Sequence, residues 1–279
     1  MLQVTLEGMA LHAGLRVSVA LRRAPGALSI VQRGRAARLA DMRVANAERG
    51  VVLVGDDGRV SLQLCEHLLA AFSGLGVHEG VEVATDDPEL PLLDGGAAAF
   101  ASALRAIDAP TGARGRLVVA RSAALRHGAA EYRFEPASDL RVDVAVEFPP
   151  PVGAERAAWD GDPEDFRARI APARTFGWAS EHAALLARGL ARGADQEGVL
   201  VFDERGALPG RPPQLPGECA RHKLLDLLGD LMVHGGLGRG RLSAHRPGHA
   251  ATHEVVAEAL RAGILESSAG GRDSEGRRP

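Results

Sequence analysis

The first third of the chain alternates apolar and polar residues in short runs that glycine and proline separate. VTLEG, LRVSVALRRA and ALSIVQRG follow a period of two, which is typical of half-buried β-strands. A further pair of strands, RGVVLVGDDGRVSL, turns at Asp56-Asp57-Gly58, a sequence that favours a hairpin. VHEGVEVAT returns to the strand pattern. This stretch therefore predicts a sheet built from short strands.

Two helical patterns interrupt the strands. After Ser61, leucine and phenylalanine recur at three- and four-residue intervals until Gly74 and Gly76. We expect a helix there that Ser61 caps and the glycines end. DGGAAAFASALRAI, which begins at Asp94, predicts a second helix.

The same order of elements returns after Gly115. RLVVARSAALR, AEYRFEP, LRVDVAVEF and VLVFDE have strand patterns, and PEDFRARIAPARTFG leads into a helix. A leucine-rich helix follows from about Pro216, then the strand RGRLSAHR and the closing helix HAATHEVVAEALRAGIL. We therefore predict an α+β fold of two related domains, each a mainly antiparallel sheet packed on helices.

The point where this order of elements begins again, near residues 110–116, sets the predicted boundaries. The first domain spans 1–113, and the second spans 114–266 with an insert near 186–207. The last residues, 267–279, have no apolar periodicity, and we expect a disordered tail.

Charge and hydropathy exclude several classes of protein. The net charge of -3 and the pI of about 6.4 argue against a general nucleic-acid binder, which carries a basic excess or a dense basic stripe. No segment approaches the ~18–20 apolar residues that span a bilayer, and no secretory signal stands at the N-terminus. Two cysteines, Cys65 and Cys219, are too few for a disulfide framework. They are either zinc ligands or buried apolar filler, which is the commoner role. We expect a soluble, cytoplasmic protein.

The helix that contains RHKLLDLLGD has two faces. At ~100° per residue His222, Asp226 and Asp230 fall along one line, with leucines opposite. A helix with its charges in water is the ordinary explanation of this pattern. Lys223 argues against it, because it is the single lysine among 33 basic residues. In this chain arginine stands at every other basic position, where a positive charge is enough. We therefore infer that position 223 requires the compact ammonium group of lysine.

Two motifs supply candidate metal ligands. In CEHLLAA, Glu66 and His67 lie on an otherwise apolar helix, where a lone histidine is more often a hydrogen-bonded core residue. His222 and Asp226 are four residues apart and share a helical face, as a chelating pair requires. With His67 they form a set of three ligands, which is typical of a catalytic zinc site with its fourth position open. Glu66 then lies beside a water molecule held by the metal, as a general base does.

Three histidines, His245, His249 and His253, recur at intervals of four in HRPGHAATH. Exposed histidines at the start of a helix are the ordinary explanation. The Pro-Gly pair before His249 indicates a turn that brings this residue to the N-terminal end of the closing helix, where side chains project into clefts. Asp230 is suited to hold such an imidazole protonated. In ARTFGW, Thr175 offers a hydroxyl to a developing oxyanion, which is weak evidence by itself.

Six motifs in this order resemble a known family: GMALHAG, CEHLLAAFSGLGV, DPELPLLDGGAAAF, APARTFGW, RHKLLDLLGDL and PGHA. They are similar to the UDP-3-O-acyl-N-acetylglucosamine deacetylases, the zinc amidases of lipid A synthesis, from about residue 3 to about residue 265. The resemblance implies two α+β domains with the active site between them.

The resemblance also implies a role for each candidate residue. The metal ligands of the family fall here on His67, His222 and Asp226, and the metal is Zn²⁺, with Fe²⁺ as the other possibility. The catalytic groups fall on Glu66 (general base), His249 with its partner Asp230 (general acid), Thr175 (oxyanion donor) and Lys223 (cation). Phe176, followed by Gly177, corresponds to the residue that contacts the sugar.

Three regions depart from the family pattern. Ala130 and Glu131 stand where a Lys-Trp pair is usual, and Leu64 stands where threonine is common. The insert reads ARGADQEGV, with Arg192 and Asp195 where an apolar passage for the acyl chain is expected. The acyl-chain length is therefore left open.

We expect a metal-dependent amide hydrolase that removes the N-acetyl group from UDP-3-O-(3-hydroxyacyl)-N-acetylglucosamine. Its partner is this UDP-linked amino sugar, without nucleic acid or a transmembrane segment, and we expect a monomer. One alternative is a paralogue that deacetylates another N-acyl sugar, which the altered insert favours. The other is a non-catalytic nucleotide-sugar binder, which has no need of an acid and a base such as His249 and Glu66.

Overall fold

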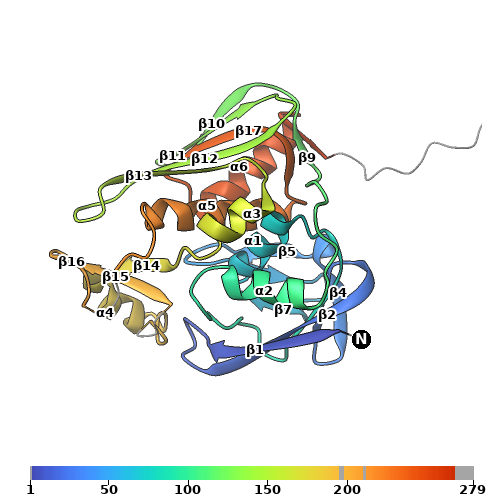
Figure 1. Ribbon diagram of the computed structural model, residues 1–279, viewed down its shortest axis with the longest axis horizontal. Coiled ribbons are helices and arrows are strands. Elements are labelled where there is room, and N and C mark those ends of the chain that lie inside the picture. Colours follow the sequence, from blue (N-terminus) through green and yellow to red (C-terminus); the bar gives the residue numbers. More distant parts are fainter. Residues whose placement is uncertain (1, 195–197, 210–211, 268–279) are drawn as a thin grey trace, which may run out of the picture.

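The computed structural model describes residues 2–194, 198–209 and 212–267 of the 279-residue chain. Two sheets enclose a central layer of helices (Figure 1). Each sheet is mainly antiparallel, so the predicted α+β class is confirmed. Ser267, the first residue of the predicted tail, ends strand β18 (Leu265–Ser267), and the rest of that tail lies outside the described residues.

The first half is built on a five-stranded sheet of order β1-β2-β8-β3-β4. Its strands are β1 (Gln3–Met9), β2 (Arg16–Ala27), β3 (Ser29–Gln32), β4 (Arg35–Arg38) and β8 (Glu79–Ala84). In β2 the valines at 17 and 19 are buried while Arg16 and Ser18 are exposed, as the period-two pattern predicts. Only the pairing of β3 with β8 is parallel.

A small three-stranded sheet follows β4 and includes the predicted hairpin. It consists of β5 (Arg43–Asn46), β6 (Val52–Val54) and β7 (Ser61–Gln63). Ser61 therefore belongs to a strand, and the prediction that it caps a helix is wrong. Because β7 stays paired with β6 up to Gln63, the chain turns only at Leu64, whose φ is 54°, and helix α1 (Glu66–Leu75) starts after Cys65.

The second half repeats this layout. Its sheet has the order β10-β11-β17-β12-β13, with strands β10 (Ala123–His127), β11 (Ala130–Glu135), β12 (Leu140–Glu147), β13 (Ala154–Trp159) and β17 (Leu237–His245). The short strand β9 (Leu117–Val119) pairs with β17 and β18. In both halves the strand after the central helix enters between the second and third strands, antiparallel to one and parallel to the other. The two halves thus share one topology, while the predicted domain boundaries stay a prediction.

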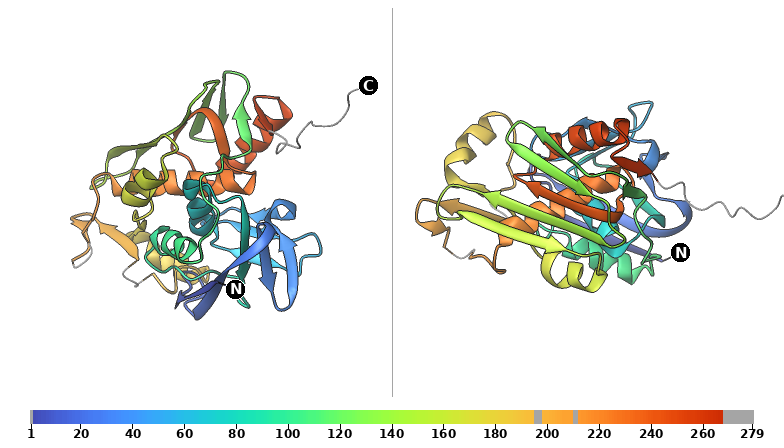
Figure 2. Two further views of the ribbon diagram at one scale, coloured as in Figure 1. Left: turned by 45° about the vertical axis from the view of Figure 1, so that its right-hand side comes forward. Right: turned by 90° about the horizontal axis from the view of Figure 1, so that it is seen from above.

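Helices α1 and α5 (Glu218–Val233) pack against each other between the two sheets, with α2 (Ala98–Ala106) beside α1 and α6 (His249–Arg261) beside α5 (Figures 1 and 2). The contact between α1 and α5 is very close at Gly229. A Cβ atom at this position would lie 2.1 Å from the backbone oxygen of Glu66. Glycine is therefore the residue that lets the two helices approach, because any side chain would push them apart.

An additional unit lies between β13 and α5 and extends from one end of the molecule (Figure 1). It begins with α3 (Pro163–Asp165) and a wider helical turn, Phe166–Ile170. Strands β14 (Thr175–Trp178), β15 (Val199–Asp203) and β16 (Gly206–Ala207) then form a small sheet with α4 (Ala179–Ala187) beside it. The part from Thr175 to Ala207 is called the insert below.

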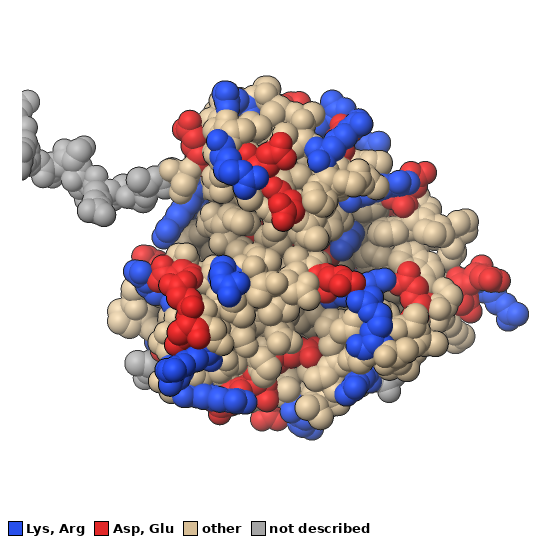
Figure 3. Space-filling view, turned by 180° about the vertical axis from the view of Figure 1, so that it is seen from behind, with Lys and Arg blue, Asp and Glu red and all other residues tan. Residues whose placement is uncertain are grey.

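The surface agrees with the charge pattern of the sequence. On the face opposite to that of Figure 1, acidic and basic side chains are interspersed and form no stripe of one sign (Figure 3). Within the described residues, no helix is both long enough and apolar enough to cross a bilayer.

Candidate active site

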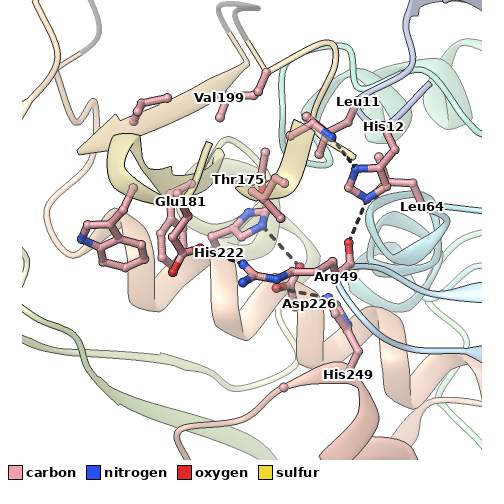
Figure 4. A pocket seen from close by; sticks show the side chains of 18 of the residues that line it. Leu11, His12, Arg49, Leu64, Thr175, Glu181, Val199, His222, Asp226 and His249 are labelled. Carbon is pink, nitrogen blue, oxygen red and sulfur yellow. Dashed lines mark hydrogen bonds and ion pairs between the residues drawn. The ribbon is translucent and has the colours of Figure 1, made fainter. Parts of the chain in front are cut away.

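A cavity of about 840 Å³ lies where α1, α5, α6 and the insert meet (Figure 4). Every residue that the sequence predicts for the site lines it except one: Glu66, His67, Thr175, Phe176, Gly177, His222, Lys223, Asp226 and His249. The exception, Asp230, lies behind His249 and accepts a hydrogen bond from it. The fold therefore brings together residues that are far apart in the sequence.

The three candidate metal ligands converge in this cavity. His67 is in the first turn of α1, His222 and Asp226 are in successive turns of α5, and one donor atom of each lies within 4.8 Å of the others. The Nε2 atoms of His222 and His67 lie 3.4 and 3.9 Å from Oδ1 of Asp226. All three side chains are buried, so the ordinary explanation of this helix, charges in water, is wrong.

The donor atoms fit a divalent metal. The Nδ1–H of His222 donates to the backbone oxygen of Ala173 at 3.0 Å, which leaves the Nε2 lone pair directed at the other ligands. Burial lowers the pKa of His67 to about 3 and also lowers the pKa of His222, so both rings are neutral at pH 7. Oδ1 of Asp226 is buried and has no hydrogen-bond partner among the described residues. An unpaired buried carboxylate oxygen is costly unless a cation neutralises it.

Asp226 also pairs with the single lysine. Its Oδ2 lies 2.6 Å from Nζ of Lys223, while its Oδ1 faces the imidazoles. Burial alone would raise the pKa of Asp226, but His222 and Lys223 outweigh burial and hold that pKa well below its usual value. Burial alone would lower the pKa of Lys223, and Asp226 raises it instead. The ammonium thus stays charged inside the cavity wall, as the sequence predicts.

Glu66 lies beside the ligands at the start of α1. Its Oε2 accepts a hydrogen bond from the backbone N–H of Val51 at 3.0 Å, and its Oε1 lies 3.8 Å from Nε2 of His249. Burial raises the pKa of Glu66, and the positive charge of His249 opposes this effect. A carboxylate with a raised pKa accepts a proton more readily than an exposed one, which suits a general base.

His249 begins α6 and faces the same space (Figure 4). Its Nδ1–H donates to both oxygens of Asp230, at 2.9 and 3.1 Å, and its Nε2 lies 3.8 Å from Oδ2 of Asp226. Burial alone would lower the pKa of His249, but Asp230 and Asp226 raise it to about 9. At pH 7 the ring therefore carries a proton that can be donated toward the cavity.

The insert forms the opposite wall through β14. Thr175 is half-buried and lines the cavity (Figure 4). The Phe176 ring stands edge-on to the rings of Phe148 and His222, with centroid distances of 5.1 and 5.9 Å. At Gly177 no atom lies within 4 Å of the point where a Cβ would be, so the wall leaves open space there.

A buried ion pair holds β14 against α5. Arg174, the residue before Thr175, is 6% exposed and donates to Glu218 in the first turn of α5, with Nε 2.8 Å from Oε1. Its Nη2 also donates to the backbone oxygen of Pro212 at 2.7 Å. The pair therefore fixes the wall that carries Thr175 relative to the helix that carries His222.

Away from the ligands the cavity is mainly apolar, although Glu48, Arg49, Glu181 and His182 also line it. Its lining there includes Leu11, Leu64, Leu185, Ala191, Ala194, Val199, Val201 and Leu208. Arg192, one of the departures from the family pattern, is not part of this lining and packs instead against Gly14. Asp195 lies outside the described residues. The described wall of the insert is therefore less polar than its sequence indicates.

Two of the other departures, Ala130 and Glu131, lie away from the ligands, whereas Leu64 lines the cavity. Ala130 is buried at the start of β11, and Glu131 forms ion pairs with Arg126 and Arg133 at 2.7 and 2.6 Å. Both cysteines are buried in apolar clusters, and burial raises the pKa of each thiol. Neither belongs to the described group that can hold a metal, so the filler interpretation is confirmed.

Sequence analysis missed part of the cavity wall. The ring of His12 contacts the backbone oxygen of Arg49 at 3.0 Å, and the backbone N–H groups of His12 and Ala13 donate to Glu89 at 2.6 and 2.9 Å (Figure 4). The signal was a histidine inside the glycine-flanked loop GMALHAG, which contains no other polar side chain.

Comparison with known proteins agrees with this arrangement. The profile of the family described as LpxC: UDP-3-O-acyl N-acetylglycosamine deacetylase matches residues 2–261. The chain is 34% identical over 269 residues to the UDP-3-O-acyl-N-acetylglucosamine deacetylase of Myxococcus xanthus, covering 92% of this chain and 83% of the relative. It is 31% identical over 271 residues to that of Syntrophotalea carbinolica, covering 92% and 85%. Over 264 residues it is 31% identical to that of Shewanella pealeana, covering 91% and 86%.

Proposed function

The chain belongs to the UDP-3-O-acyl-N-acetylglucosamine deacetylase family, and on this premise we propose how its residues carry out the hydrolysis. The protein removes the N-acetyl group from a UDP-linked, 3-O-acylated glucosamine in lipid A biosynthesis. The observation that carries the proposal is Oδ1 of Asp226, which accepts no hydrogen bond from the described residues. The neutral imidazoles of His67 and His222 lie within 4 Å of this oxygen, and the charged imidazole of His249 lies within 4 Å of Oδ2.

His67, His222 and Asp226 hold the metal, and zinc is our choice because two imidazoles and one carboxylate are a common catalytic zinc set. Ferrous iron also accepts this set of ligands. When bound, the metal supplies a Lewis acid that polarises the acetamide carbonyl and makes a coordinated water more acidic.

Glu66 acts as the general base. Its Oε2 is occupied by Val51, so Oε1 remains to take a proton from the attacking water. His249 acts as the general acid and gives its Nε2 proton to the departing amine nitrogen, while Asp230 holds the ring from behind. Glu66 ends with one proton more and His249 with one fewer. The 3.8 Å between Oε1 and Nε2 is longer than a hydrogen bond, so this proton returns through one bridging water.

The remaining residues stabilise and orient the substrate. Thr175 donates to the oxygen that becomes negative when the carbonyl is attacked, and Lys223 adds positive potential on the same side. Phe176 packs against the sugar, and Gly177 leaves the space that the sugar needs. The apolar part of the cavity accommodates the 3-O-acyl chain. A cytoplasmic location and a monomeric state stay predictions.

The test is acetate release from UDP-3-O-(3-hydroxyacyl)-N-acetylglucosamine, before and after treatment with a metal chelator. We expect release that stops on chelation and returns with Zn²⁺ or Fe²⁺. Glu66→Gln should lower kcat by about 10²-fold or more, because a positioned base contributes at least that much. Glu79→Gln, an exposed glutamate of β8, is the control. Release from simple N-acetyl sugars alone would favour the paralogue, and binding without any release would favour the non-catalytic binder.

A further inference from the structure

Two further histidines stand behind the proposed general acid. His253 follows His249 by one turn of α6, and His234 follows Asp230 by one turn at the end of α5. The four side chains alternate between the packed helices in the order His249, Asp230, His253, His234. This arrangement results from two pairs at a spacing of four residues, each pair on one helical face.

The contacts along this line are short. Nε2 of His253 lies 3.6 Å from Oδ1 of Asp230, and Nδ1 of His253 lies 3.0 Å from Nε2 of His234. His253 is 8% exposed and Asp230 is 1% exposed, so both side chains are buried in the protein interior. Nε2 of His253 is buried without a hydrogen-bond partner among the described residues. Its nearest charged group is therefore the carboxylate that holds His249.

Electrostatics selects the tautomers of the two rings. If Nδ1 of His253 carried the hydrogen, the bare Nε2 lone pair would face the negative carboxylate of Asp230, which is repulsive. With the hydrogen on Nε2, the N–H dipole points at the carboxylate, and Nδ1 is free to accept from Nε2–H of His234. Burial lowers the pKa of both rings, that of His234 to about 4, so each is neutral at pH 7 and has only one hydrogen to place.

We propose that His253 is a positioning residue for the general acid, and that His234 fixes its tautomer. With its hydrogen on Nε2, His253 directs an N–H dipole at Oδ1 of Asp230 from 3.6 Å, and this attraction favours the orientation in which both carboxylate oxygens accept from His249. Outer partners of this kind orient the groups that act directly on a substrate. The proposal rests on the proposed function, because it assigns a support to the acid of that reaction.

The line ends at a second cavity of about 870 Å³, which His234 and His253 help to line. The two cavities share Ala47 and Ala250. His127 lines the second cavity as well, but it is exposed and, in the described part of the chain, forms no hydrogen bond or ion pair with these four side chains. It therefore provides a matched control histidine.

Three substitutions of one residue test the proposal in the metal-loaded enzyme. His253→Gln keeps an N–H near the place of Nε2, His253→Asn keeps only a group near Nδ1, and His253→Leu keeps neither. We expect kcat to fall about tenfold in the Asn and Leu variants with KM unchanged, and to recover to within about twofold of the parent in the Gln variant. His127→Leu should leave both constants unchanged.

Equal loss in all three variants, or none in any, would overturn the proposal. If the Leu variant does not fold, the contrast between Gln and Asn decides the question. A measurement independent of activity is the ¹⁵N NMR spectrum of the imidazoles at pH 7, in which we expect the hydrogen of His253 on Nε2. A hydrogen on Nδ1 would also overturn the proposal, even in an active deacetylase. A protein without activity but with the expected tautomer would instead contradict the proposed function.

Discussion

The two halves of the molecule have the same strand order but use their central helices differently. Helix α1 carries its site residues, Glu66 and His67, in its first turn and is otherwise apolar and buried. Helix α5 carries a polar line of just over two turns, from His222 to Asp230, through the middle of the molecule. The difference shows that one half presents two of the proposed metal ligands at a fixed helical spacing, and that the other half brings the third proposed ligand to them only through the contact between α1 and α5.

The largest effect is expected where that contact is closest. Gly229→Val places side-chain atoms where even a Cβ would lie 2.1 Å from the backbone oxygen of Glu66. We expect a loss of unfolding free energy of more than about 4 kcal/mol, because backbone on both sides must move. Chemical denaturation measures it. The control is Gly55→Ala, where the nearest atom would be 3.4 Å from the new Cβ, and it should change stability little. A stable Gly229→Val enzyme with normal kcat would show that the close contact between α1 and α5 does not determine the geometry of the site.

The second effect concerns the buried ion pair at the start of α5. Arg174→Met leaves Glu218, which is 1% exposed, as an unpaired buried charge at the start of α5. Breaking one partner of a buried ion pair costs about 3–5 kcal/mol, and we expect a value near the lower end because backbone N–H groups of Arg174 and Gln214 still donate to Glu218. Arg174→Met combined with Glu218→Leu should recover part of the loss. Unfolding curves of the single and double variants check this, and a double variant no better than the single one would contradict it.

These two sites also mark what the sequence can and cannot predict. The spacing of His222, Asp226 and Asp230 defines one helical face, so their alignment follows from local geometry. The position of His67 next to that face does not follow from local geometry. It depends on the close approach of Gly229 to the backbone oxygen of Glu66, and such an approach leaves no pattern of side chains in the sequence. His67 was joined to this face from the ligand count of a catalytic zinc site, and the resemblance to a family implies the same set. Ser61 failed as a cap for a similar reason, since strand pairing held it in β7.

The third effect concerns the charge that α5 places behind the acid. The pKa of His249 is raised to about 9 mainly by Asp230, against the opposing effect of burial. Asp230→Asn removes that charge, and we expect the basic limb of the pH profile of kcat/KM to move down by about 1–3 pH units. A metal bound by Asp226 would offset part of the negative charge that raises the pKa of His249, so the basic limb of the parent enzyme would lie below pH 9. Parent and variant are therefore compared with the same metal. An unmoved limb would mean that another group sets it.

The same raised pKa makes a prediction for stability. In the metal-free protein, protonated His249 stabilises the fold fully below its unfolded pKa of 6.5, and this contribution is lost as the pH rises through about 9. Denaturation midpoints between pH 6 and pH 10 should therefore fall more steeply in the parent than in Asp230→Asn. Parallel curves would contradict the assignment of the charge to this pair.

The smallest effect is expected where the insert meets the first half. Helix α4 has no buried residue, and Arg49 joins it through an ion pair with Glu181 at 3.0 Å, both partners being more than two-fifths exposed. An exposed pair contributes about 0.2–1 kcal/mol and is screened by salt. A double-mutant cycle of Arg49→Gln and Glu181→Gln, measured by denaturation at low and high salt, should give a coupling in this range that shrinks with salt. A coupling above about 2 kcal/mol that salt does not change would mean that this edge of the cavity is shielded from water, and that the insert is held as firmly as α5.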